Sequence, residues 1–230
     1  MESTSKQGTT LELWLNDVQS YLYRMTRPAM EHARFSFSRT DYTYRRKNKK
    51  STDELAIVFL SQFPVNYRVN FQLEIRHPQI RQVKESFMNG IAQKTSHLSS
   101  LVLYLKDFVS SVEPDEVPAK DYFIYNHRDL FLVGDQLTQM FQYELVPLCD
   151  RLSSLALMDD FFSGRPDWAL NTHGGGNICT DLIAAKLNGK RDVEQRYREL
   201  MAGIEDRIRL QQISPESREL LNLCYESLKK

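Results

Sequence analysis

A run of strictly alternating residues between positions 66 and 76 most constrains how this chain can fold. Every second residue is apolar and the intervening residues are polar, which gives two sets: Tyr67, Val69, Phe71, Leu73 and Ile75, against Arg68, Asn70, Gln72, Glu74 and Arg76. Successive side chains of a strand point to opposite faces of a sheet. The pattern therefore predicts a long β-strand with one buried face and one polar face.

Several other segments are candidate partners for this strand. Residues 55–60 are apolar at every position, which indicates a strand covered on both faces. Shorter apolar or aromatic segments complete the candidates, at residues 35–37, 42–45, 101–105 and 122–125. The polar residues 48–53 are expected to connect the second and third strands. Together these segments predict an antiparallel meander.

Helical periodicity marks the segments expected to cover this sheet. Apolar residues recur three and four positions apart at residues 11–25, 80–87, 137–152, 178–187, 193–208 and 220–228. Pro28 is expected to break the first helix and Pro147 to kink the third. Two pairs of adjacent carboxylates, Asp53–Glu54 and Asp159–Asp160, each indicate a helix start or a loop. Opposite charges four residues apart predict ion pairs on one late helix, Asp192 with Arg196, Glu194 with Arg198, and Glu205 with Arg209.

The periodicity changes from two before Arg76 to 3.6 after Gly176, which predicts an α+β fold. We expect an antiparallel sheet of about four to six strands packed with helices, followed by a helical C-terminal region. The predicted division is a core domain at residues 9–170 and a helical region at residues 171–230 packed on it. Residues 1–8 are polar and are expected to be disordered.

The order of these elements resembles that of a known group of domains. A helix is followed by an aromatic-rich meander ending in Val69-Asn70-Phe71-Gln72-Leu73, then by a helix, and later by a helix with Leu145-Val146-Pro147-Leu148. This order resembles certain uncharacterised bacterial α+β domains catalogued as domains of unknown function. The resemblance spans residues 9–205 and implies the fold, with no catalytic residue attached to it.

Charge and cysteine content exclude several classes of protein. Lysine plus arginine and aspartate plus glutamate both number 30, so the formal net charge is zero. This balance argues against a nucleic-acid or anionic-membrane partner. Cys149, Cys179 and Cys224 are far apart and form no CxxC motif, so we expect them to be small core residues in a reducing interior. The N-terminus is unlike a signal peptide and the apolar runs are short, which predicts a soluble cytoplasmic protein.

Two motifs invite a catalytic interpretation. His173-Gly174-Gly175-Gly176 matches the oxyanion loop of esterases, but the chain has no G-x-S-x-G nucleophile turn. The loop is expected to be a flexible connector, with an anion nest as the alternative. His127-Arg128-Asp129-Leu130 matches the start of a kinase catalytic loop, but Gly134 stands where a magnesium-binding asparagine is required. The histidine spacing indicates no metal site, and no cofactor is predicted.

The polar face of the strand at 66–76 is the remaining candidate site. Its side chains, Arg68, Asn70, Gln72, Glu74 and Arg76, would stand in a row and could specify a protein partner. We therefore predict a non-catalytic interaction module of the neutralising or adaptor type, with an unknown protein partner. The alternative is an enzyme whose scattered active site lies in a cleft between the sheet and the C-terminal helices.

Overall fold

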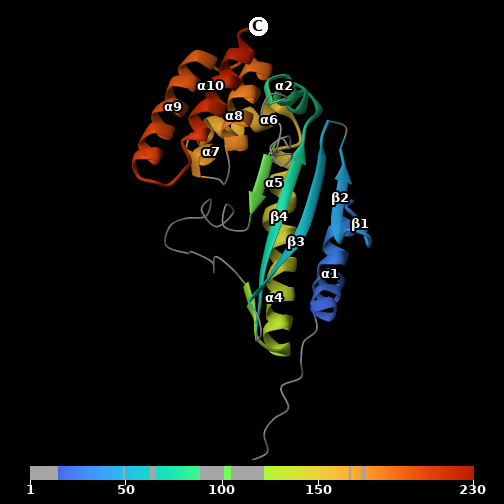
Figure 1. Ribbon diagram of the computed structural model, residues 1–230. Helices are drawn as coiled ribbons and strands as arrows, with labels where there is room; N and C mark the ends of the chain where they lie inside the picture. The colour runs from blue at the N-terminus through green and yellow to red at the C-terminus, as the bar shows by residue number, and fades with distance from the viewer. Residues whose placement is uncertain are drawn as a thin grey trace, which may run out of the picture.

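The computed structural model has an α+β fold, as the change of periodicity predicts. A long antiparallel sheet has helices against one face and a helical unit at one end (Figure 1). Helix α4 (His127–Met140) lies behind the sheet in this view, and helices α8 to α10 lie at its upper end. The structure describes residues 15–48, 50–62, 66–88, 101–104, 122–165, 167–171 and 175–230.

Six described strands form the sheet, in the order β1-β2-β3-β4-β5, with β6 also paired to β4. Their bounds are β1 Ser36–Ser38, β2 Thr43–Lys47, β3 Thr52–Gln62, β4 Asn66–Arg76, β5 Leu101–Tyr104 and β6 Tyr122–Ile124. Strand β4 has the predicted limits. β5 and β6 share one of its edges, because β5 pairs from Gln72 to Ile75 and β6 pairs from Tyr67 to Val69.

The connection between β2 and β3 is shorter than the predicted 48–53. Strand β3 begins at Thr52, so Asp53 and Glu54 belong to the strand instead of marking a loop or a helix start. The Asn48 amide donates to the Ser51 carbonyl oxygen at 2.8 Å and closes the turn. Glu54 pairs with Arg45 and Asp53 with Arg46, both on the neighbouring strand β2. These cross-strand ion pairs explain why charged residues belong to the paired part of the hairpin.

The inner face of the sheet is buried under helix α1 (Leu15–His32), α4, the π-helical turn η2 (Phe141–Leu145) and α5 (Val146–Arg151). The ring of Phe71 on β4 meets that of Phe141 edge to face, with centroids 5.8 Å apart. The apolar residues of β2, β3 and β4 on this face are almost fully buried: Tyr44, Leu55, Ile57, Val69, Phe71, Leu73 and Ile75.

One prediction about proline was wrong, and one predicted helix begins earlier than expected. Pro28 lies inside α1, which continues to His32 because the fully buried Met30 anchors its last turn in the core. The helix predicted at residues 137–152 begins earlier, at His127, where the Asn126 side chain caps it by accepting from the Asp129 amide at 3.0 Å. A π-helical turn stands directly before Pro147, which has no amide hydrogen to donate.

The helices at the end of the sheet are α2 Pro78–Met88, α6 Leu155–Gly164, α7 Trp168–Asn171, α8 Gly175–Asn188, α9 Val193–Arg209 and α10 Glu216–Leu228. Helix α6 was missed, and Asp159 and Asp160 lie inside it instead of at a helix start or in a loop. Helix α6 packs on α8, and α7 packs on α8 and α9. The division of the chain near residue 170 stays a prediction. Across the described ranges, no helix is long and apolar enough to span a membrane.

Candidate binding surface on the sheet

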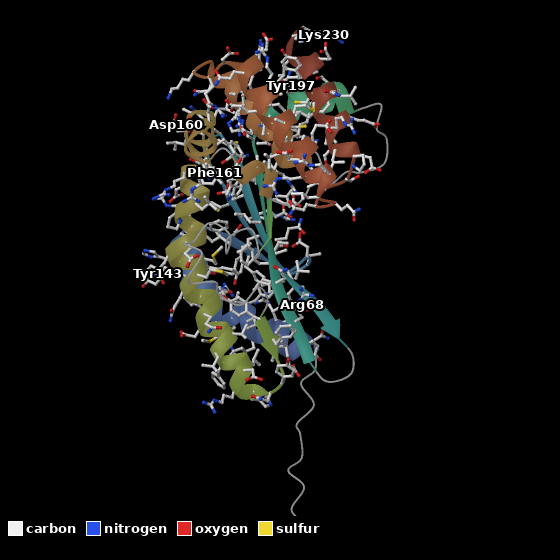
Figure 2. All side chains as sticks on the ribbon, turned by 90° about the vertical axis from the view of Figure 1, so that its left-hand side faces the viewer. Arg68, Tyr143, Asp160, Phe161, Tyr197 and Lys230 are labelled. Carbon is white, nitrogen blue, oxygen red and sulfur yellow. The ribbon has the colours of Figure 1, made fainter. Side chains whose placement is uncertain are left out.

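The outer face of the sheet is the face turned away from α4 and α5. Figure 2 shows these helices on one side of the strands and Arg68 on the other. All five predicted residues of β4 lie on this face: Arg68, Asn70, Gln72 and Glu74 are half-buried, and Arg76 is exposed. The strict alternation of β4 explains why these five residues share the outer face. When the apolar residues of the strand point into the core, every intervening polar residue points outward.

Four charged residues form a ladder across β2, β3 and β4 on this face. The register sets Glu54 opposite Glu74, a like-charge pair that would be unfavourable by itself. Arg76 compensates for it by pairing with Glu54 at 3.1 Å and with Glu74 at 2.8 Å. Arg45 pairs with Glu54 at 3.3 Å. We call Arg45, Glu54, Glu74 and Arg76 the charge ladder, and its charges neutralise one another.

An aromatic pair stands at the other end of the outer face. Phe123 on β6 is directly opposite Arg68 on β4. Its ring stacks with that of Tyr125, with centroids 6.1 Å apart and an angle of 18° between the planes. Phe123 is 39% exposed and Tyr125 53% exposed. This pair was not predicted, although residues 122–125 were predicted as a strand and side chains two positions apart on a strand share one face. In the structure Tyr125 directly follows β6.

Residues 45–50 form a basic run in the sequence, and Arg46 within it is buried in the structure. Arg46 turns to the inner face, where it donates to Asp53 at 2.8 Å and pairs with Asp150 of α5 at 2.9 Å. Its guanidinium lies over the ring of Phe35, 4.7 Å from the centroid. Burial raises the pKa of the Asp53 carboxyl, and the pair with Arg46 opposes this effect. These contacts fasten the hairpin to α5.

A second buried ionic network joins α6, α8 and α9. The Asp181 carboxylate accepts from Arg191 at 2.7 Å and from Nε of Arg196 at 3.0 Å. Asp159 accepts from Arg191 and, at 2.7 Å, from Asn188. Because both oxygens of each carboxylate accept hydrogen bonds, the network holds the three helices together.

This network changes the predicted ion pairs of α9. Glu194 pairs with Arg198, as predicted. Asp192 instead caps the helix by accepting from the amides of residues 194 and 195, at 2.9 and 3.1 Å. Arg196, its predicted partner, pairs with Asp181. The third predicted pair is also replaced, because Arg209 pairs with Asp206 and Glu205 with Arg218.

A pocket of about 440 Å³ opens beside the network. It is lined by Phe162, Ser163, Arg191, Asp192, Gln195, Arg196 and Glu199. These residues come from α6, from α9 and from the segment before α9, so this pocket does not lie against the sheet. The predicted alternative, an enzyme with a cleft between the sheet and the C-terminal helices, stays a prediction.

The predicted anion nest lies partly outside the described residues. His173 and Gly174 fall there, whereas Gly175 and Gly176 begin α8. The next residue, Asn177, binds the backbone of Val102 on β5, donating to its carbonyl oxygen at 2.8 Å and accepting from its amide at 3.1 Å. The nest therefore stays a prediction. Within the described ranges, no group of three or more His, Cys, Asp or Glu residues could hold a metal ion.

Comparisons with known proteins find no match among protein-family models, curated proteins or solved structures. The resemblance to bacterial domains of unknown function therefore stays a prediction.

Proposed function

We propose that this protein is a non-catalytic protein-interaction module of the neutralising or adaptor type, and that its partner binds the outer face of the sheet. The observation that carries the proposal is the stacked pair Phe123 and Tyr125, which lies beside Arg68 and stays 39% and 53% exposed. Arginine and large aromatic side chains dominate binding energy at protein interfaces. A partner that covered this pair would bury apolar area that is now hydrated.

The charge ladder supplies the second part of the argument. Its two arginines and two glutamates lie on three neighbouring strands, so a partner must present the opposite arrangement of charges to match them. Such complementarity selects among partners more than it adds affinity. Glu54 and Glu74 also favour a protein over a nucleic acid, because their carboxylates would repel phosphate groups.

Inverting the whole ladder tests this proposal. The variant Arg45→Glu, Glu54→Arg, Glu74→Arg, Arg76→Glu changes two charges in each direction, so the net charge stays zero. It also retains an opposite charge at every contact within the ladder. Outside the ladder the variant loses the pair of Arg45 with Asp41, and this exposed contact contributes less than about 1 kcal/mol. The partner, however, would meet an inverted charge pattern.

The assay compares capture of proteins from the native host by wild type and by three variants at modest salt. A true partner is retained by wild type, lost with the inverted ladder, and lost with the double variant Phe123→Ala, Tyr125→Ala. It remains bound to the control Leu210→Ala, which removes a 61% exposed side chain at the end of α9. Equal capture by all four proteins, each shown to be folded by circular dichroism, would refute binding at the outer face.

A further inference from the structure

Helix α4 presents two large apolar side chains to solvent, on the side opposite its buried face. The buried face packs on α1 and on the sheet, and its residues are Leu130, Val133, Gly134, Leu137 and Met140. The opposite side carries Phe131, which is 60% exposed, and Leu132, which is 54% exposed. The outward side of a helix that covers a core is ordinarily polar. Neighbouring apolar side chains there indicate an interaction surface.

The exposed apolar surface extends from α4 to α1. The ring of Phe131 meets that of Tyr21 edge to face, with centroids 5.2 Å apart, and the Arg24 guanidinium lies over the Tyr21 ring, 5.3 Å from its centroid. Gly134 keeps the two helices close, because a Cβ at this position would lie only 3.3 Å from atoms of Met25 and Tyr21. Phe131 is therefore supported from one side while most of its surface faces water. A side chain held in this way loses little conformational freedom on binding.

Two charged residues flank the apolar pair on the same side of the helix. Arg128 and Asp135 are both exposed, and residues seven positions apart share one side of an α-helix. Seven residues of helix span about 10 Å, so these two side chains cannot pair with each other. Asp135 accepts a hydrogen bond from the side-chain amide of Gln139 at 2.9 Å. Among the described residues, neither Arg128 nor Asp135 has an ion-pair partner.

We propose that two copies of this protein associate through α4, with the two helices antiparallel and a two-fold axis between Phe131 and Leu132. Such an axis sets position 131 of one copy against position 132 of the other, and position 128 against position 135. The apolar residues of both copies then form the centre of the interface. Arg128 of each copy meets the partner's Asp135, so one ion pair lies on either side of the apolar centre.

The order of these four residues favours a second copy over an unrelated partner. A two-fold interface uses the same surface on both subunits and must therefore be complementary to itself. In either direction from the axis an apolar residue comes first and a charged residue follows, and the two charges have opposite signs. Charges of one sign at both positions would repel each other across the interface. The sequence of α4 thus matches its own reverse in both apolar character and charge.

This surface is separate from the outer face of the sheet. Figure 2 shows the helices on one side of the strands and Arg68 on the other. A dimer formed through α4 therefore leaves the charge ladder uncovered in both copies and does not depend on the proposed function. It would carry two partner-binding faces in one particle, and a partner with two matching sites would be held more tightly by both than by one.

Sedimentation equilibrium of the full-length protein at micromolar concentration tests the proposal. Wild type should sediment with twice the mass of one chain. Arg128→Glu and Asp135→Arg should each raise the dissociation constant of the dimer at least about tenfold, because each places like charges against each other at two symmetry-related contacts. The double variant Arg128→Glu, Asp135→Arg should dimerise nearly as well as wild type, because opposite charges face each other again.

Two further variants locate the interface. The double variant Phe131→Ala, Leu132→Ala should be monomeric, because it removes the apolar centre. Tyr143→Ala is the matched control and should remain a dimer. Tyr143 is 69% exposed on η2, and the axis sets it against position 120, outside the partner's α4. Circular dichroism establishes that each variant is folded.

A monomeric wild type would overturn the proposal. So would a dimer that the loss of both apolar side chains leaves intact. A double charge reversal that dimerises no better than the two single reversals would overturn the antiparallel register.

Discussion

Replacing Lys84, a buried residue of α2, by methionine should stabilise the protein at neutral pH. Burial lowers the pKa of Lys84 from an ordinary value of 10.5 to about 8. Each pKa unit corresponds to about 1.4 kcal/mol at 25 °C. Keeping the protonated amine in the folded core therefore costs about 3 kcal/mol at pH 7. Methionine retains an unbranched, flexible side chain of similar length and removes the charge, so the variant should recover most of this free energy.

The pH dependence distinguishes this explanation from a simple gain in packing. The folded pKa lies below the unfolded one, so between pH 8 and 10.5 the unfolded wild type binds more protons than the folded wild type. Stability of the wild type must then rise with pH through this window, relative to the variant. The difference in free energy of unfolding should be full at pH 7 and should shrink toward pH 10.5.

Urea unfolding of both proteins at four pH values from 7 to 10 measures this difference. Lys186→Met on α8 is the matched control, because Lys186 is exposed and its replacement should change stability little at any pH. A gap between wild type and Lys84→Met that stays constant from pH 7 to 10 would refute the reasoning, and so would a variant that is less stable throughout.

Two further substitutions test the packing of the C-terminal helices by thermal or urea unfolding. Asp181→Asn should destabilise the protein by about 3–5 kcal/mol, because its two arginine partners lose a buried carboxylate; Glu199→Gln, at the exposed edge of the same network, should cost less than about 1 kcal/mol. Gly203→Ala should cost about 1–3 kcal/mol, because the added Cβ would lie 2.3 Å from Leu170 Cδ1. Gly164→Ala, whose Cβ would meet nothing within 4 Å, should cost less, and equal losses would contradict the overpacking argument.

The strands were predictable where a local pattern repeats. Strand β4 has the predicted limits because one register buries all its apolar residues, and a shift by one residue would expose them. The start of β3 was not predictable, because Asp53 and Glu54 are stabilised by arginines on the neighbouring strand β2. In the sequence alone two adjacent carboxylates indicate a loop, because their ion-pair partners cannot be identified. The register between β2 and β3 identifies these partners.

Helix α6 was also not predictable, because the partners of its buried carboxylate are distant in the sequence. Asp159 is buried within it, and its partners Asn188 and Arg191 lie 29 and 32 residues further along the chain. A short sequence segment contains only one of these three residues, so a local pattern cannot reveal that they interact. The polar face of β4 was predictable, because the alternation within this one strand defines it. The position of Phe123 beside Arg68 was not predictable, because it depends on the pairing of β6 with β4.

The internal neutrality of the charge ladder has a kinetic consequence. Each glutamate of the ladder has an arginine within about 3 Å, so the field of the ladder weakens quickly with distance from the sheet. Rapidly associating proteins use long-range attraction, and without it association rates are about 10⁵–10⁶ M⁻¹ s⁻¹. A partner would thus find this face by unguided collision, and added salt would slow its arrival little. The lifetime of the complex, set by contacts that form after arrival, would decide how strongly it binds.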